Sequence, residues 1–383
     1  MRSLYLHVPF CARKCLYCAF YSEPAPAELV DRYVAALSRE MEQVTAELKP
    51  RTVFFGGGTP SLLSAAQWAR VLEVMAHLDL LGAAEWTVEC NPATLSLEKA
   101  RLLRSFGVNR VSLGVQSFDD HLLNRLGRIH TRDEIFASFD LLRRAGFENL
   151  NLDLMFAIPG QTMAAWRATL AEAMALQPEH LSCYEVIYEE DTPLFAQLAA
   201  GRLDVNEELA CDLYEELLAL TDRHGLAQYE IANFAKRLEG DAAGEVPRLA
   251  CQHNVNYWRG GPFHGLGPSA TSYVNGIRTK NTPDTVRYCE QWEQGQPVIE
   301  SSEQLSPLAR AGETAAFGLR MTAGWPFEQF QQVTGFDLRL EWPEEIRELV
   351  AKGWGQLEID RFRLTRQGLR FADAAAELLL RPG

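Results

Sequence analysis

The sequence predicts an α/β fold in which a partial (β/α)6, TIM-like barrel is followed by a C-terminal α+β, winged-helix-like module. Two observations support the barrel: six short apolar segments alternate with helical patterns over residues 1–235, and this alternation stops after Phe234. A third supports the module, because helical patterns from Ser306 onward are followed by two short strand patterns. Periodicity alone leaves a doubly wound open sheet as an alternative to the barrel.

The first part of the chain contains the strands and helices of the predicted barrel. The strands are rich in Val, Leu and Phe and are short enough to be buried parallel strands. They are Leu4–Val8, Thr52–Phe55, Thr87–Glu89, Arg110–Val115, Leu150–Met155 and Leu181–Val186. The predicted helices are Ala27–Leu48, Ala65–His77, Leu97–Phe106, Arg132–Ala145 and Met163–Leu176. Helix N-caps are expected at Ser64, Ser96 and Thr131, and helix ends at Gly107 and Gly146.

The pattern after the barrel predicts a different architecture. Lys236–Leu249 is charged and predicts a loop, and the glycine-rich Gly260–Gly276 predicts an ordered but irregular segment. Two strands, Gln356–Ile359 and Phe362–Leu364, precede a final helix at Arg366–Leu380. We therefore expect a barrel at 1–235, a linker with the glycine-rich segment at 236–300, and a helical, winged-helix-like domain at 301–383.

Composition and charge exclude several classes of protein. The chain has 383 residues, of which 47% are hydrophobic, enough to bury a large core without disulfides. Lys and Arg number 37 and Asp and Glu 51, so the formal charge of −14 argues against a nucleic-acid partner. The sequence contains neither an apolar run that would span a bilayer nor a secretory signal, so we expect a cytoplasmic protein.

Three of the eight cysteines, Cys11, Cys15 and Cys18, form a C-x3-C-x2-C motif directly after the first predicted strand. Three thiolates at this spacing can hold a [4Fe–4S] cluster from one loop, leaving one iron open to a substrate or cofactor. Reactive surface thiols and a zinc site are alternatives; zinc requires a fourth ligand, for which His7 is available. The second strand ends in Gly56–Gly58, where glycines either admit a ligand to the backbone or form a simple turn.

These motifs resemble the radical S-adenosylmethionine (SAM) superfamily, and additional motifs resemble its oxygen-independent coproporphyrinogen III oxidase-like branch. In chain order, the motifs are HVPFC at 7–11, FFGGGTPSLL at 54–63, ECNP at 89–92, GVQSF at 114–118, LGR at 126–128, DLMF at 153–156, PGQT at 159–162 and HNVNYW at 253–258. The resemblance is specific because so many motifs occur in order.

The resemblance implies a radical SAM barrel with a [4Fe–4S] cluster on the three cysteines and SAM at the open iron. It implies SAM contacts from Tyr5, Gly58, Thr59, Glu89, Gln116, Arg128 and Asp153. Most of these residues lie at the carboxyl ends of predicted strands, where barrel sites form. A carboxylate suits the ribose hydroxyls, and the Arg128 guanidinium suits the SAM carboxylate.

Within this branch the chain resembles the HemW family of heme chaperones more than the HemN enzymes. HemN enzymes have a fourth cysteine two residues after the third, where this chain has Phe20. The chain also departs from the usual pattern at three positions: Thr271 stands in place of His, Ala157 in place of Gly, and Ala19 in place of a common Asp. The substitution at Thr271 removes a histidine contact.

The segment around HNVNYW is the candidate heme site. Thiol and imidazole groups are common axial ligands, and aromatic rings pack against a macrocycle. The candidate heme-binding residues are Cys251, His253, Asn254, Tyr257 and Trp258, with His264 as a further candidate ligand. From the residues alone, a structural loop with a satisfied histidine and a core tryptophan is favoured; the resemblance to HemW brings the two interpretations level.

The resemblance implies a cytoplasmic heme chaperone that binds a [4Fe–4S] cluster, SAM and heme and transfers heme to an acceptor protein. The implied partners are an acceptor such as a respiratory component, through which the protein would meet a membrane, and an electron donor to the cluster. The alternatives are coproporphyrinogen III dehydrogenase, acting in anaerobic heme synthesis, and another tetrapyrrole-modifying radical SAM enzyme. We assign no catalytic residue from the sequence.

Overall fold

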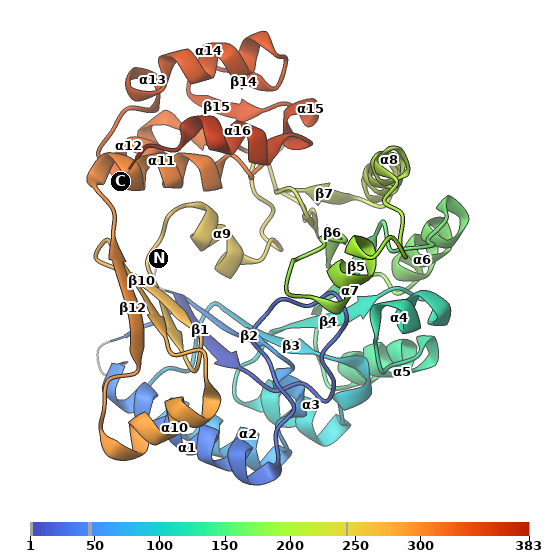
Figure 1. The fold of residues 1–383 in the computed structure, drawn as a ribbon, viewed down its shortest axis with the longest axis vertical. Coiled ribbons are helices and arrows are strands. Elements are labelled where there is room, and N and C mark those ends of the chain that lie inside the picture. The colour runs from blue at the N-terminus through green and yellow to red at the C-terminus, as the bar shows by residue number, and fades with distance from the viewer. Residues whose placement is uncertain (1–2, 45–47, 243, 383) are drawn as a thin grey trace.

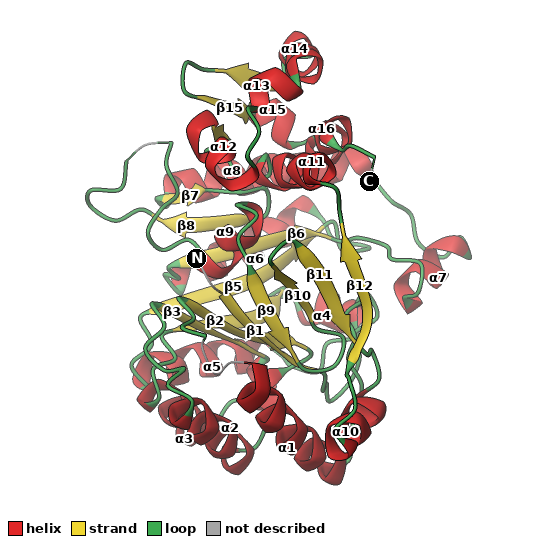
Figure 2. Ribbon diagram, turned by 90° about the vertical axis from the view of Figure 1, so that its left-hand side faces the viewer, coloured by secondary structure: helices red, strands yellow, loops and turns green. Residues whose placement is uncertain are grey.

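The computed structural model describes residues 3–44, 48–242 and 244–382. In this part of the chain, one sheet of twelve strands curves through the molecule, and a three-stranded sheet belongs to the C-terminal module (Figure 1, Figure 2). The large sheet has the order β12-β11-β10-β9-β1-β2-β3-β4-β5-β6-β8-β7. Its central strands are β1 (Ser3–Val8), β2 (Thr52–Gly57), β3 (Glu85–Cys90), β4 (Arg110–Gln116), β5 (Asn149–Phe156) and β6 (His180–Glu185).

The order of these central strands decides between the two predicted architectures. Each strand from β1 to β5 pairs in parallel with the next strand in the sequence. A barrel has this sequential order, whereas a doubly wound sheet reverses its order at a switch point. The partial (β/α)6 barrel is therefore confirmed, and the doubly wound alternative is excluded.

The connecting helices cover the outer face of the sheet, and most begin where the sequence predicted (Figure 2). They are α1 (Ala27–Val44), α2 (Ala65–His77), α3 (Leu97–Ser105), α4 (Asp120–Leu126), α5 (Arg132–Arg144) and α6 (Met163–Ala175), with 3-10 turns at Pro60–Leu62 and Pro92–Thr94. The side chains of Ser64, Ser96 and Thr131 cap α2, α3 and α5 by accepting a backbone N–H three residues on. The predicted continuation of α1 toward Leu48 crosses residues 45–47, which lie outside the described residues.

Alternate residues of the central strands face opposite sides of the sheet, and the two sides differ in polarity. In β4, Val111, Leu113 and Val115 are buried in the hydrophobic core with the outer helices. Ser112 and Gln116, on the same strand, line a cavity on the inner side. The helices are therefore held by an apolar face, while the inside of the barrel presents polar groups.

The prediction of an irregular segment at Gly260–Gly276 is wrong, because this region extends the large sheet beyond β1. It contains β9 (Phe263–Leu266) and β10 (Thr271–Val274), and these are followed by β11 (Ile277–Asn281), α10 (Thr285–Gln294) and β12 (Ile299–Gln304). The glycine content reflects close strand packing: a Cβ on Gly265 would lie 2.1 Å from the Thr271 carbonyl oxygen. The domain boundaries at 235 and 300 stay a prediction.

The other edge of the large sheet, beyond β6, carries the next elements of the chain. They are α7 (Pro193–Ala199), α8 (Glu207–Arg223), β7 (Leu226–Gln228) and β8 (Asn233–Lys236), followed by α9 (Gln252–Trp258). Strand β8 pairs antiparallel with β6, so the parallel part of the sheet ends there. Helix α9 lies in the space between the barrel and the C-terminal module (Figure 1).

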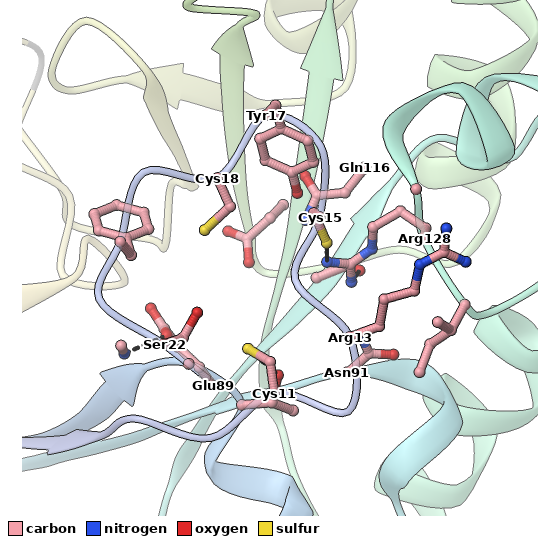
Figure 3. Close-up of a pocket in the computed structure, with 18 of the residues that line it drawn as sticks. Cys11, Arg13, Cys15, Tyr17, Cys18, Ser22, Glu89, Asn91, Gln116 and Arg128 are labelled. Carbon is pink, nitrogen blue, oxygen red and sulfur yellow. Dashed lines mark hydrogen bonds between the residues drawn. The ribbon is translucent and has the colours of Figure 1, made fainter. Parts of the chain in front are cut away.

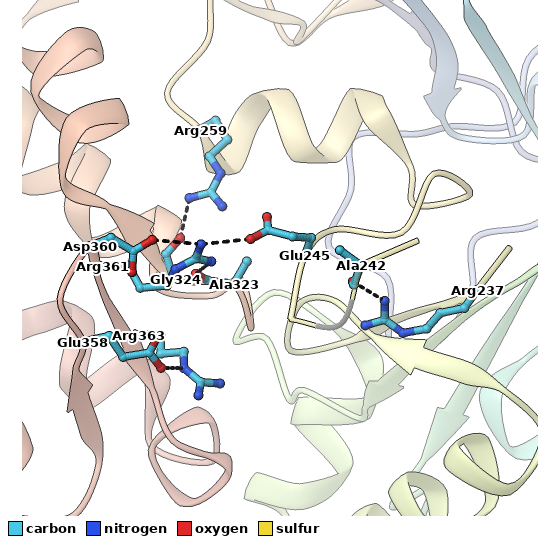
Figure 4. A network of polar contacts seen from close by, with 10 residues as sticks. All are labelled: Arg237, Ala242, Glu245, Arg259, Ala323, Gly324, Glu358, Asp360, Arg361 and Arg363. Atoms are coloured by element: carbon cyan, nitrogen blue, oxygen red, sulfur yellow. Dashed lines mark hydrogen bonds and ion pairs between the residues drawn. The ribbon is translucent and has the colours of Figure 1, made fainter. Parts of the chain in front are cut away.

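The C-terminal module has the element order of a winged helix and its own core. It contains α11 (Pro307–Gly318), β13 (Trp325–Pro326), α12 (Phe327–Thr334), α13 (Leu338–Glu341), α14 (Pro343–Ala351), β14 (Gly355–Leu357), β15 (Arg361–Leu364), α15 (Arg366–Leu369) and α16 (Ala372–Leu379). The predicted final helix is thus two short helices. Polar contacts join the module to the preceding chain: Arg361 donates to Glu245 over 2.9 Å and Arg259 to the Gly324 carbonyl over 2.6 Å (Figure 4).

Candidate functional site

The three clustered cysteines line one cavity of about 440 Å³ at the carboxyl ends of the central strands (Figure 3). Cys11, Cys15 and Cys18 lie in the loop between β1 and α1, and all three are partly exposed. Active sites of barrel proteins form at this end of the strands. The loop therefore places its thiols where a bound group would contact the strand ends.

Backbone contacts hold the cysteine loop at its start, middle and end. The Cys11 N–H donates to the Glu23 carbonyl over 3.1 Å, which closes the loop at its base. The Leu16 N–H donates to the Leu126 carbonyl over 3.0 Å, so the tip rests on the end of α4. Gly127 permits this contact, because a Cβ there would lie 2.9 Å from the Leu16 Cγ.

The donor set fits a multi-iron cluster. In the part of the chain that the structure describes, no three His, Cys, Asp or Glu side chains converge on a point that could hold a single metal ion. The three thiols line one shared cavity, and a cluster several atoms wide requires such a space. Arg128 donates to the Cys15 sulfur over 3.5 Å, and the Cys11 sulfur lies 3.5 Å from the Thr59 hydroxyl. Both contacts tie a cysteine of the loop to the wall of the cavity.

The glycine segment packs against the base of the cysteine loop. Gly57 has φ 105°, and a Cβ there would lie 2.4 Å from the His7 ring. The Gly58 and Thr59 N–H groups donate to the carbonyls of Val8 and Phe10, over 2.8 and 2.7 Å. A side chain at Gly58 would collide with these same backbone atoms. The glycines are thus required by packing, and they also leave Gly58 and Thr59 lining the cavity.

Two partly buried carboxyl groups, Glu89 and Asp153, line the cavity with the cysteines. Glu89 accepts from the Gly57 N–H over 3.2 Å, and burial, reinforced by the charge of Asp153, raises its pKa to about 8. Asp153 accepts from Ser112 over 3.1 Å and from Asn151 over 2.7 Å, and burial raises its pKa. These contacts hold both carboxyl groups in place at the cavity.

Arg128 and Gln116 also line the cavity. Arg128 donates to the Gly114 carbonyl over 2.6 Å in addition to its contact with Cys15. Gln116 has φ 66°, a strained conformation for a non-glycine residue, where the β4–β5 register shifts. The shift directs the Gln116 side chain into the cavity.

Six of the seven residues predicted to contact SAM line this cavity: Gly58, Thr59, Glu89, Gln116, Arg128 and Asp153. The seventh, Tyr5, lines an adjoining cavity of about 200 Å³ on the side of α9. Its hydroxyl lies 3.0 Å from His7 Nδ1. The SAM contacts themselves stay predictions; the structure shows that these residues share one region of the barrel.

Sequence reasoning missed several polar residues of the barrel interior. Tyr17 lies between two of the cysteines and lines the main cavity, as do Ser112 and Tyr184. Asn151 orients Asp153 from below. The sequence signal that could have found them is the alternation of polar and apolar residues along the predicted strands. Largely apolar residues separate polar residues at positions 110, 112 and 116, at 151 and 153, and at 180, 182 and 184.

The candidate heme ligand His253 is buried in α9, with both ring nitrogens engaged. Its Nδ1 lies 3.0 Å from the Thr52 hydroxyl, and its Nε2 lies 2.8 Å from the Tyr257 hydroxyl. Because Thr52 donates its proton to Ser3, Thr52 accepts from His253 Nδ1–H, and Nε2 accepts from Tyr257. Burial lowers the His253 pKa to about 3, so the ring is neutral and has no free lone pair for iron.

Cys251 is the N-cap of α9 and is equally enclosed. Its thiol lies 3.5 Å from Glu85, whose carboxylate accepts from the backbone N–H groups of Gln252 and His253 over 2.8 and 2.9 Å. Burial raises the Cys251 pKa to about 12, so the thiolate that binds a metal is disfavoured. These observations support the structural interpretation of the motif.

The other candidate heme residues lie on two sides of α9. Asn254 and Tyr257 line the smaller cavity together with His253. Trp258 faces the C-terminal module, where the Arg320 guanidinium lies 4.9 Å from its ring centroid. His264 lies in β9, in register with Leu4 of β1. Three of the candidate heme residues therefore line one cavity, whereas Cys251, Trp258 and His264 do not line it.

Comparisons with known proteins identify the family. The radical SAM superfamily model matches residues 5–173, and the HemN C-terminal domain model matches residues 305–371. The heme chaperone HemW of Bacillus subtilis (strain 168) is 36% identical over 378 residues, covering 96% of this chain and 96% of the relative. The chain belongs to the HemW family. The HemW of Escherichia coli (strain K12) is 34% identical, covering 99% of this HemW-family chain and 98% of the relative.

The solved structures support the fold of this HemW-family protein. Coproporphyrinogen III oxidase (HemN) from Escherichia coli, described as a radical SAM enzyme, matches with a TM-score of 0.83. The match covers 99% of this chain and 89% of that one at 21% identity, which shows a shared fold. Membership of the radical SAM superfamily implies a [4Fe–4S] cluster and SAM as cofactors, and the cavity with its three cysteines provides a suitable donor set.

Proposed function

We propose that this protein is a heme chaperone: it binds heme and transfers it to an acceptor protein, with a [4Fe–4S] cluster on Cys11, Cys15 and Cys18. The observation that carries the proposal is a single cavity lined by these cysteines and by six predicted SAM contacts, in a chain that matches curated heme chaperones along nearly its whole length. The proposal retains heme as cargo and SAM as the ligand of the open iron.

The residues of the cavity have complementary roles in this proposal. A bound cluster supplies one-electron reduction of SAM. Arg128 provides a cation beside Cys15 that can pair with the SAM carboxylate. Ser112 and Asn151 hold Asp153 in the position of a hydrogen-bond acceptor for ribose hydroxyls. The glycine segment, which lines the cavity, would offer backbone groups to the SAM amino group.

The enzyme alternative, coproporphyrinogen III dehydrogenase, is not favoured. The curated relatives given above are heme chaperones, and Phe20 stands where the HemN enzymes have a fourth cysteine. The likeness to HemN at 21% identity concerns the fold alone. A product assay with coproporphyrinogen III, SAM and a reductant separates the two functions, because only the dehydrogenase forms protoporphyrinogen.

A heme carrier of this type needs two kinds of partner. The function requires a heme acceptor, for which we propose a respiratory hemoprotein, and a one-electron donor to the cluster. No helix in the described part of the chain is both long and apolar enough to cross a bilayer. We propose that any contact with a membrane is made through the acceptor.

The experiment that tests the function is heme transfer by the anaerobically reconstituted protein. The protein is loaded with ferric heme, separated from free heme, and mixed with a heme-free b-type hemoprotein. Appearance of the acceptor's own Soret spectrum, at a rate faster than from free heme, supports the chaperone. Formation of protoporphyrinogen in the parallel product assay, with no heme transfer, would show that the enzyme alternative is correct.

A further inference from the structure

Four exposed apolar side chains surround the mouth of the cysteine-lined cavity, and we call them the apolar rim. They are Phe20, 71% exposed, Ile187, 66% exposed, and Ile129 and Tyr184, each 42% exposed. All four line the cavity itself. The surface of a soluble protein carries a cluster of large apolar side chains mainly where a ligand or a partner binds, because exposing such side chains to water is costly.

The rim is assembled from three parts of the chain that are distant in the sequence. Phe20 lies in the cysteine loop, Ile129 follows α4, and Tyr184 and Ile187 lie at and just after the end of β6. Other strongly exposed apolar residues are far from this cavity's lining, such as Ile359 between β14 and β15, 96% exposed, and Leu340 in α13, 76% exposed. Convergence of separate elements on one opening distinguishes the rim from such single residues.

Charged side chains line the same cavity as the rim. Arg13 lies in the cysteine loop, is exposed and lines the cavity. Among the described residues, the structure shows no hydrogen bond or ion pair to its guanidinium. Lys14 beside it is also exposed. Glu185 and Glu189 also line the cavity and are close in sequence to Tyr184 and Ile187. The Arg13 side chain is a cation available at the cavity. An apolar ligand with anionic groups at one edge would therefore place those groups toward Arg13.

We propose that heme docks on the apolar rim, with its macrocycle against Phe20, Ile129, Tyr184 and Ile187 and a propionate toward Arg13. This inference rests on the proposed heme-carrier function and assigns the cargo a location. Heme is an extended apolar ring with two carboxylates at one edge, which matches the rim in both respects. The ring covers the mouth of the cavity, and SAM occupies the space beneath it.

The residues of α9 are poorer candidates for the same ligand. Binding iron at His253 or Cys251 would break their contacts with Thr52 and Glu85, which hold α9 on the barrel, and the bond to Tyr257 within α9. The adjoining cavity of about 200 Å³ is also smaller than the pockets that enclose drug-sized ligands. The rim needs no such rearrangement, because its side chains are already exposed.

The test is a titration of cluster-loaded protein with ferric heme, followed by Soret absorption, for rim variants and matched controls. Phe20→Ser and Ile187→Ser each remove one large apolar contact, and we expect each to weaken heme binding about tenfold, equivalent to about 1.4 kcal/mol. Ile359→Ser and Leu340→Ser remove comparably exposed apolar groups elsewhere and leave the affinity unchanged. The cluster absorbance and the SAM affinity of each variant are measured first, to show that the cluster and the SAM site are intact. Ile187 is remote in sequence from the cysteines, so an effect of Ile187→Ser on heme binding does not come from a change within the cysteine loop.

A second variant tests the proposed orientation. Arg13→Gln weakens binding of heme several-fold but leaves binding of heme dimethyl ester, which has no free propionates, unchanged. Equal weakening for both probes contradicts a propionate contact at Arg13.

The outcomes separate this inference from the function on which it rests. If the wild-type protein binds heme and the rim variants bind it with the same affinity, the rim is not the docking site. This conclusion holds whether or not a Trp258→Ala variant loses heme binding. If the rim variants bind heme normally but fail to transfer it, the rim contacts a protein partner, and the inference is wrong. If the wild-type protein binds no heme at all, the proposed function itself fails.

Discussion

Replacing His253 tests whether the HNVNYW motif binds heme or holds α9 on the barrel. The side chain is 1% exposed and joins Thr52 of β2 to Tyr257 of α9. His253→Ala removes two buried hydrogen bonds of about 1 kcal/mol each and leaves their partners without replacements. With the lost packing of the ring, we expect the barrel to lose about 3 kcal/mol of unfolding free energy. His253→Asn retains a donor near Thr52, and we expect it to lose about half as much.

The assay measures stability and heme binding on the same samples. Urea unfolding, followed by circular dichroism, gives the change in free energy, and Soret titration gives the heme affinity. If the interpretation is correct, His253→Asn is destabilised but, below its unfolding transition, binds heme with wild-type affinity. A folded His253→Asn protein of wild-type stability that has lost the Soret band would refute the reasoning, because it would show that His253 binds iron.

The pH dependence of the same variant provides an independent check. In the folded protein the pKa of His253 is about 3, well below the value of about 6.5 for an unfolded histidine. The unfolded chain therefore binds a proton that the folded chain does not, and stability decreases as the pH falls below about 6.5. His253→Asn removes this titration, so its stability decreases less steeply between pH 6.5 and pH 4 than that of wild type. Equal slopes for the two proteins would contradict the burial argument.

Three further predictions concern the cysteine ligands of the cluster, the backbone at Ala157 and the buried carboxyl group of Glu40. Replacing Cys11, Cys15 or Cys18 with Ser abolishes the visible absorption of the reconstituted cluster, whereas Cys211→Ser, at an exposed position on α8, retains it; retention in all variants would exclude the cysteine site. Ala157 has φ 56°, so Ala157→Gly relieves left-handed strain and stabilises the barrel by up to about 1 kcal/mol in urea unfolding; a destabilised variant would show that the strain is absent. Glu40 accepts from Tyr288, Gly267 and Asn281, and burial raises its pKa to about 6. The folded state therefore binds the proton of the Glu40 carboxyl group more tightly than the unfolded state does. The stability that this difference provides is lost as the pH rises from about 4.5 through 6. Wild type should lose about 2 kcal/mol relative to Glu40→Gln between about pH 3.5 and about pH 7, as measured by urea unfolding at each pH; parallel pH profiles would refute this.

Much of the barrel was predictable because its signals are local. A capping side chain and its helix lie within a few residues of each other, and for this reason the helix Ala65–His77 was predicted to the residue. The cysteine motif spans eight residues, so its ligands share one loop whatever the rest of the chain does. Local patterns failed at Gly260–Gly276, where the strands form only by pairing with β1 and with each other.

The sequence by itself determined the βα alternation, the cysteine loop and the identity of the family, because periodicity, spacing and motif order are properties of the chain. Tertiary structure decided which side chains meet. His253 is held by Thr52, 201 residues away, and that contact favours a structural role over heme ligation. The apolar rim likewise exists only because the cysteine loop, the end of α4 and the end of β6 converge on one cavity. Such convergence depends on long-range packing, to which periodicity and spacing along the chain are blind.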